Sequence, residues 1–127
     1  MIEHVSVPVG DFERAKAFYN VALKPLGYTL YRDYSPNAAG YLEGESTSLW
    51  IARKEEKVQP MHVALRGESK EAIQKFYDEA LAAGGTDNGG PGFRTEYGDD
   101  YYAAFVLDPD GNNIEACFFG EKAPKKE

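Results

Sequence analysis

The sequence contains a repeat with a period of 58 residues, and this repeat limits the folds that the chain can adopt. The segment HVSV begins at His4, and the similar segment HVAL begins at His62. Further identical pairs follow at the same separation: Phe18 and Phe76, Tyr19 and Tyr77, Ala22 and Ala80, Leu23 and Leu81, Gly27 and Gly85. Such a repeat indicates one supersecondary unit that occurs twice. The two histidines of the chain therefore occupy equivalent positions in two similar units.

Both copies predict the same order of secondary structure. Alternating residues with β-branched side chains are typical of strands, and apolar residues at helical spacing are typical of a helix. Asp11 and Ser69 are expected to cap the two helices. The expected elements are strands at 2–9, 28–34, 40–44 and 47–53 with a helix at 12–22, then strands at 61–66, 101–107 and 113–119 with a helix at 72–81, and a loop with a weak strand at 86–100. Each copy therefore has the order β-α-β-β-β.

This order predicts an α+β fold of two tandem βαβββ modules, with sheets that curve into a cup. Alternation places one set of apolar residues under the two helices: Val5, Val7, Val9, Val63 and Leu65. It leaves His4, Ser6, His62 and Ala64 on the opposite, uncovered face. Two such faces would form a cup lined by both histidines, either within one chain or between two. We expect one domain at 1–120, with modules at about 1–57 and 58–120, and a polar tail at 121–127.

Composition excludes several classes of partner. The chain has 127 residues and a net charge of −7, which argues against nucleic acid or an anionic membrane as partner. A single cysteine, Cys117, excludes a disulfide within the chain and suits a reducing compartment. The first residues lack the pattern of a signal peptide, and no apolar run reaches the roughly 20 residues of a membrane helix. We therefore expect a cytoplasmic protein.

Glu115 is the third candidate metal ligand, after His4 and His62. In the last expected strand it shares one face with Cys117, while Ile114 and Ala116 share the other. A carboxylate at the middle of an apolar strand is costly to bury unless a cation pairs with it. Two neutral imidazoles and one carboxylate form a ligand set that suits catalytic zinc or non-haem iron. The sequence therefore predicts a site for a divalent metal ion at His4, His62 and Glu115.

These residues also carry a resemblance to a known family. With Phe18-Tyr19 and the run from Asp108 to Glu115, which reads DPDGNNIE, they make the chain resemble the vicinal-oxygen-chelate superfamily. That superfamily contains glyoxalase I, extradiol dioxygenases, fosfomycin-resistance enzymes and bleomycin-resistance proteins. The resemblance implies a glyoxalase-like fold and up to four metal ligands, of which His4, His62 and Glu115 match the first, third and fourth.

The position of the second ligand departs from the glyoxalase I pattern. Aligning Leu49-Trp50-Ile51 with Ile114-Glu115-Ala116 places Trp50 where glyoxalase I carries a glutamate. Indole does not bind a metal ion, so the three remaining ligands resemble those of extradiol dioxygenases and fosfomycin thiol-transferases. The metal implied is Fe, Mn, Zn or Ni.

The remaining candidate site residues follow from alternation. Glu115 and either Tyr101 or Tyr102 are candidate catalytic groups, since one of the two tyrosines must face the cup. The candidate pocket residues are Ser6, Trp50, Ala64, Arg94 and Cys117. Trp50 is interpreted as a flat wall against which an aromatic or apolar substrate could stack.

Two functions remain open at this point. The first is a small metal-dependent enzyme, a lyase, isomerase or dioxygenase, that acts on a small molecule with two neighbouring oxygen atoms. The alternative is a binding protein without metal, as in bleomycin resistance, in which His4, His62 and Glu115 only hydrogen-bond one another. Both interpretations include a small-molecule partner, and the resemblance implies a homodimer.

Overall fold

The computed structural model describes residues 2–45, 48–57 and 59–125. The first module consists of β1 (His4–Val9), α1 (Phe12–Ala22), the short 3₁₀ helix η1 (Lys24–Leu26), β2 (Tyr28–Tyr34), β3 (Ala38–Glu43) and β4 (Ser48–Arg53). The second consists of β5 (His62–Arg66), α2 (Lys70–Ala82), β6 (Thr86–Asp87), β7 (Gly92–Phe93), β8 (Tyr101–Leu107) and β9 (Asn113–Phe119). The expected α+β class is therefore confirmed. Thr47, where we expected a strand to begin, and 126–127 of the expected tail lie outside the described residues.

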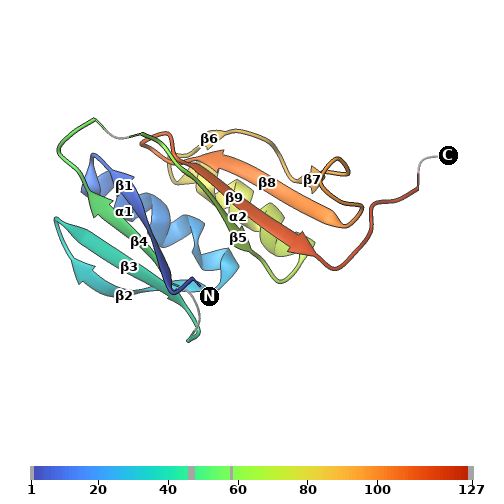
Figure 1. The fold of residues 1–127 in the computed structure, drawn as a ribbon, viewed down its shortest axis with the longest axis horizontal. Helices are drawn as coiled ribbons and strands as arrows, with labels where there is room; N and C mark the ends of the chain where they lie inside the picture. The colour runs from blue at the N-terminus through green and yellow to red at the C-terminus, as the bar shows by residue number, and fades with distance from the viewer. Residues whose placement is uncertain (1, 46–47, 58, 126–127) are drawn as a thin grey trace.

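The two modules form two separate sheets with matching topology. The first sheet has the order β1-β4-β3-β2, and the second has the order β5-β9-β8-β6, with β7 also paired to β8. In each module the opening strand runs parallel to the closing strand, β1 beside β4 and β5 beside β9. The expected weak strand at 86–100 consists of two short strands, β6 and β7. Figure 1 shows the sheets side by side along the long axis, with α1 and α2 on one side of them. Each sheet therefore has one face without a helix.

A single apolar core joins the two modules on the helix side. Both helices begin at the expected caps, where Asp11 accepts from the Arg14 amide at 3.2 Å and Ser69 accepts from the Ala72 amide at 3.1 Å. Phe18 and Phe76, which are equivalent in the repeat, are both fully buried in this core. The expected alternation is confirmed, since Val7, Val9 and Leu65 lie in the core. We call the uncovered side of each sheet its bare face.

A buried polar network also connects the modules. The turn between β8 and β9 closes with a bond of 3.0 Å from the Gly111 amide to the Asp108 carbonyl, as the DPDG sequence predicts. Asp108 accepts a bond of 2.6 Å from the Tyr19 hydroxyl of α1. Asn112 donates to the same carboxylate at 2.8 Å and to the Pro8 carbonyl of β1 at 3.0 Å. The DPDGN turn therefore fixes the start of β9 against the end of β1.

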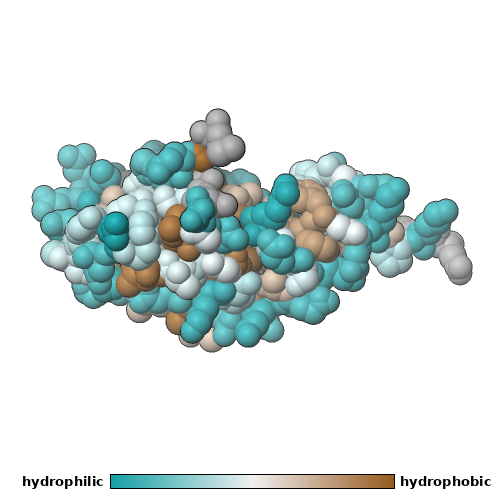
Figure 2. Space-filling view, turned by 90° about the horizontal axis from the view of Figure 1, so that it is seen from below, coloured by the Kyte–Doolittle hydropathy of each residue, from teal (hydrophilic) through white to brown (hydrophobic). Residues whose placement is uncertain are grey.

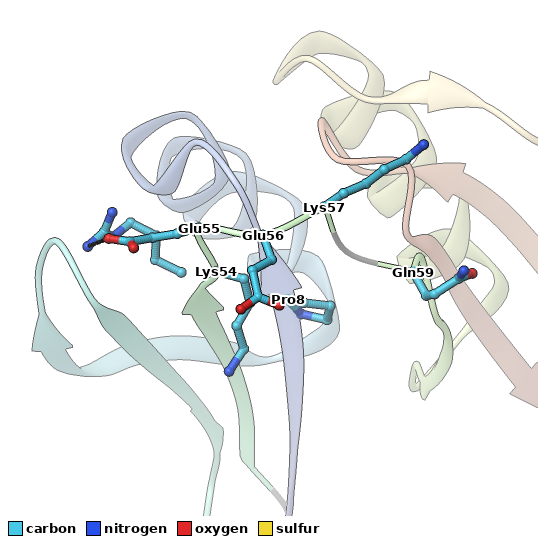
Figure 3. Close-up of a pocket in the computed structure, with 7 residues that line it drawn as sticks. Pro8, Lys54, Glu55, Glu56, Lys57 and Gln59 are labelled. Carbon is cyan, nitrogen blue, oxygen red and sulfur yellow. Dashed lines mark ion pairs between the residues drawn. The ribbon is translucent and has the colours of Figure 1, made fainter.

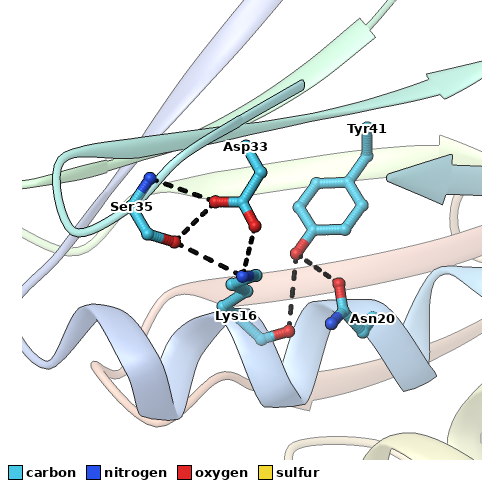
Figure 4. Close-up of polar contacts among 5 residues, drawn as sticks. All are labelled: Lys16, Asn20, Asp33, Ser35 and Tyr41. Atoms are coloured by element: carbon cyan, nitrogen blue, oxygen red, sulfur yellow. Dashed lines mark hydrogen bonds and ion pairs between the residues drawn. The ribbon is translucent and has the colours of Figure 1, made fainter. Parts of the chain in front are cut away.

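A second, more exposed cluster attaches β2 to α1 (Figure 4). Lys16 of α1 donates to Asp33 at 2.5 Å, and the Ser35 hydroxyl donates to the same carboxylate at 2.5 Å. Beside them the Tyr41 hydroxyl donates to the Asn20 side chain at 2.9 Å. Bonds from Lys16 and Ser35 hold the pKa of Asp33 at about 2, below its usual value of 3.8.

The Asp33 cluster should give stability a specific pH dependence. Because its pKa is lower in the folded state, Asp33 contributes stability above about pH 4, and this contribution is lost as the pH falls towards 2. We therefore expect Asp33→Asn to be less stable than the wild type at pH 5–7, with the difference shrinking between pH 4 and 2. Urea unfolding across this range measures it. A difference in the free energy of unfolding that stays constant down to pH 2 would contradict the lowered pKa of Asp33.

The described helices include none that is both long and apolar enough to cross a membrane. Figure 2 shows one side of the molecule, on which hydrophilic residues predominate and hydrophobic residues form small separate patches.

Candidate functional site

Glu115 is the centre of a polar cluster on the bare face of the second sheet. Its side chain is 3% exposed although it lies on a face without a helix. One carboxylate oxygen, Oε1, lies 2.7 Å from Nε2 of His62, and the other, Oε2, accepts from the Tyr101 hydroxyl. Strands β5, β9 and β8 each supply one of the three residues. The structure thus brings together two of the expected metal ligands and one of the expected catalytic tyrosines.

The surroundings keep the Tyr101 hydroxyl and the Cys117 thiol protonated. Burial and the bond to Glu115 raise the pKa of Tyr101 above its usual value, so its hydroxyl remains a donor at neutral pH. Burial and the nearby Glu115 carboxylate raise the pKa of Cys117 to about 11. Its Sγ lies 3.7 Å from the Leu65 carbonyl, to which it donates. Cys117 is therefore a neutral thiol beside the carboxylate, and the structure gives it no nucleophilic character.

Trp50 occupies the position in the first sheet that Glu115 occupies in the second. Trp50 pairs with Ser6 in the register of β1 and β4, as Glu115 pairs with Ala64 in that of β5 and β9. The indole lies over Gly40, where an added Cβ would approach it to 2.8 Å. Tyr34 is nearly parallel to it, at an angle of 11° and a centroid distance of 6.0 Å, and Tyr31 meets it edge-on at 6.0 Å. Trp50, Tyr31 and Tyr34, the aromatic trio, thus cover part of this bare face.

His4 lies apart from the other expected ligands. It opens β1 and pairs with Ser48 in register, and its Nδ1 is bonded to the neighbouring Glu3 carboxylate. Among residues 2–45, 48–57 and 59–125, no group of three or more His, Cys, Asp or Glu side chains is placed to hold a metal ion. One chain therefore brings together His62 and Glu115, but not His4.

The remaining expected site residues divide between the two faces. Tyr102 lies on the helix side, where its hydroxyl accepts from Gln74 at 2.9 Å, so Tyr101 is the tyrosine of the bare face. Ser6 and Ala64 are exposed beside Trp50 and Glu115. Arg94 stacks over the Phe105 ring at 5.4 Å and donates to the Gly90 carbonyl at 2.6 Å.

Three further residues of the second bare face were not among the expected site residues. The Phe105 ring is 6.2 Å from the His62 ring. Arg66 stacks over Phe119 at 5.3 Å, and the Phe119 ring meets the Tyr101 ring at 4.9 Å. Alternation in β9 already places Phe119 on the face of Glu115, and the same period of two in β5 could have identified Arg66 on the face of His62.

Two cavities in the described part of the chain are lined by residues other than His62, Tyr101 and Glu115. One of about 590 Å³ lies under the connector between modules, lined by Pro8 and by exposed side chains of residues 53–57 and 59 (Figure 3). Its charged residues have both signs, so no single ligand charge is favoured. A groove of about 260 Å³ runs between β1 and β5. It is lined by apolar residues that include Val5, Leu49 and Leu65, and also by Ala64 and Arg66. The Glu115 cluster instead lies on an open sheet face.

Three comparisons place the chain among known proteins. Residues 1–116 match the model of the Glyoxalase/Bleomycin resistance protein/Dioxygenase superfamily. YqjT of Bacillus subtilis (strain 168), an uncharacterized protein, is 25% identical over 131 residues, covering 90% of this chain and 95% of its own. A glyoxalase/bleomycin resistance protein from Albidiferax ferrireducens T118 has a crystal structure with a TM-score of 0.82 and 29% identity, over 94% of this chain and 99% of that one. A lactoylglutathione lyase from Agrobacterium tumefaciens shares the fold, with a TM-score of 0.71 at 15% identity over 93% and 92% of the two chains.

Proposed function

The chain belongs to the Glyoxalase/Bleomycin resistance protein/Dioxygenase superfamily, and on this basis we propose that it is a small metal-dependent enzyme. Its substrate is a small molecule with two neighbouring oxygen atoms. The observation that supports this proposal is the buried carboxylate of Glu115, held between His62 and Tyr101 on an uncovered sheet face. A carboxylate buried at such a place is costly unless a cation completes its environment.

The donor atoms of His62 and Glu115 fit a metal ion. Ligands at about 2.1 Å from the ion are about 3 Å apart in an octahedral site, as for iron, and about 3.4 Å apart in a tetrahedral zinc site. Nε2 of His62 and Oε1 of Glu115 are 2.7 Å apart, so a small movement would let both bind one ion. The hydroxyl of Tyr101 would hold the other carboxylate oxygen and fix the orientation of Glu115. A divalent Fe, Mn, Zn or Ni ion, when bound there, would act as a Lewis acid towards the substrate oxygens.

We propose that His4 of a second copy supplies the third ligand. His4 and the His62–Glu115 pair lie in different sheets, and both belong to bare faces. In a homodimer the first sheet of one copy can face the second sheet of the other, which closes a cup around both sets of residues. Ser6, Trp50, Ala64, Arg94 and Cys117 would then line it. Cytoplasmic location is part of the proposal, supported by the free, buried Cys117.

One observation favours a second candidate function. Trp50 of the aromatic trio occupies the position of the second ligand, and the trio offers flat apolar surface. A binding protein without metal would use this surface to hold a planar molecule, and its signature is quenching of Trp50 fluorescence by a ligand in the presence of a chelator.

Metal titration by calorimetry tests the leading proposal. We expect the wild type to bind one ion of Mn, Fe, Ni or Zn per chain. His62→Ala and Glu115→Gln should each bind the ion at least tenfold more weakly, because each variant lacks one side chain that binds the metal directly. Glu55→Gln removes the same charge from the connector, where Glu55 pairs with Arg53 at 3.6 Å, and should bind like the wild type. A wild type that takes up none of the four ions would contradict the proposal.

Mixing two variants tests whether the site is shared between copies. His4→Ala and Glu115→Gln should each fail to bind metal tightly as homodimers. A heterodimer of the two contains one site with both substitutions and one intact site. Co-refolding of equal amounts makes about half of the dimers heterodimers, so it should restore about a quarter of the binding. No restoration, or a 14.1 kDa monomer by light scattering, would contradict a shared site.

A further inference from the structure

Arg66 projects from the same bare face as the Glu115 cluster, near its far end. It is the last residue of β5, four residues after His62, and it pairs in register with Cys117 of β9. Residues paired in this way point to the same side of a sheet. Cys117 follows Glu115 by two residues, a distance of about 7 Å along a strand. Arg66 and Glu115 are therefore separated by a distance that one small molecule can span.

The guanidinium of Arg66 is oriented by an aromatic ring and has no carboxylate partner. It lies 5.3 Å from the centroid of Phe119, whose ring in turn meets Tyr101 at 4.9 Å. Within the described part of the chain, no Asp or Glu side chain forms an ion pair with Arg66. This is notable in a chain with 21 acidic and 14 basic residues. Arg53, by contrast, pairs with Glu55 at 3.6 Å.

We propose that Arg66 binds an anionic group of the substrate, and that this group is a carboxylate. A guanidinium presents two parallel N–H donors that match a carboxylate or a phosphate, and stacking on a ring leaves its edge free to donate. We choose the carboxylate because its single negative charge matches the single positive charge of Arg66, whereas a phosphate carries nearly two. The substrate is then a small carboxylic acid whose charged end lies at Arg66 and whose other end faces His62 and Glu115. The inference rests on the proposed function only for the reaction at the end of the substrate that faces His62 and Glu115.

Arg94 serves as an internal comparison. It also stacks on a ring of the same face, at 5.4 Å from Phe105, but one of its nitrogens already donates to the Gly90 carbonyl at 2.6 Å. That bond holds its guanidinium against the loop. Among the residues that the structure describes, none accepts such a bond from Arg66, and its side chain is exposed. Arg94→Gln should therefore affect anion binding less than Arg66→Gln.

The test uses benzoate and benzamide, which have nearly the same shape but differ in charge. NMR titration of the full chain in the presence of a chelator should show benzoate shifting the Arg66 side-chain signal, and benzamide binding at least tenfold more weakly. Arg66→Gln should lose at least tenfold in benzoate affinity, and Arg66→Lys should retain part of it. Arg53→Gln removes the same charge at the connector and should stay within twofold of the wild type. Phenyl phosphate should bind more weakly than benzoate if the site favours a carboxylate.

Two outcomes would overturn the inference: equal binding of benzoate and benzamide, or equal losses in Arg66→Gln and Arg53→Gln. Tighter binding of phenyl phosphate would overturn the choice of a carboxylate. A metal titration of Arg66→Gln separates this inference from the proposed function. Benzoate binding without metal uptake in the wild type contradicts only the metal site, and metal uptake without a benzoate effect at Arg66 contradicts only this inference.

Discussion

Asn112→Ala is expected to lower the free energy of unfolding by about 4 kcal/mol, since it leaves several buried polar groups without partners. The Asn112 side chain is fully buried and makes three bonds. Its amide donates to Pro8 of the first module and to Asp108, and its oxygen accepts from the Met61 amide at 2.9 Å. Alanine removes all three bonds in a place that water does not reach, and it weakens the connection between the end of β1 and the start of β9.

The neighbouring asparagine provides a matched control for this prediction. Asn113 is half-buried, and its side chain accepts a single bond of 3.2 Å from Asn88. Asn113→Ala should therefore cost less than about 1 kcal/mol. Denaturant unfolding of both variants measures the two values. Equal losses would mean that the DPDGN turn does not connect the modules as the structure indicates.

Much of the fold follows from the repeat and from alternation. Helix caps, strand faces and the resemblance to the superfamily are confirmed by the structure and by the match over residues 1–116. The alignment of Trp50 with Glu115 is confirmed by the register of β4 and β9 against their parallel neighbours. These features depend on contacts within one module, where spacing along the chain determines which side chains share a face.

The arrangement of the modules could not be predicted in the same way. The sequence placed His4 and His62 on bare faces, but it left open whether one chain brings them together. That outcome depends on how α1 and α2 pack, with Phe18 of the first module reaching Gly85 and Val106 of the second. Contacts between distant segments leave no periodic signal. The same limit explains why the network of Asn112 was missed, although its DPDGN turn was recognised.

Gly85 shows how equivalent positions of the repeat can need glycine for different reasons. A Cβ at Gly85 would lie 2.5 Å from Val106, 2.8 Å from Phe18 and 2.9 Å from the Ala80 carbonyl oxygen. Those atoms belong to β8, α1 and α2, which converge here around the shared core. Gly85→Ala is therefore expected to lower the free energy of unfolding by about 3 kcal/mol through overpacking. Thermal or denaturant unfolding measures this loss.

Gly27, the equivalent residue of the first module, is the matched control. It has a φ of +88°, in the left-handed region, and a Cβ there would meet the Glu43 side chain at 3.4 Å, an ordinary contact. Gly27→Ala should cost about 1–2 kcal/mol through backbone strain, and Gly27→Asn less, because asparagine tolerates this conformation. Gly85→Asn, in contrast, should be at least as damaging as Gly85→Ala. If asparagine relieved both sites equally, close packing between the modules would not be the reason for glycine at position 85.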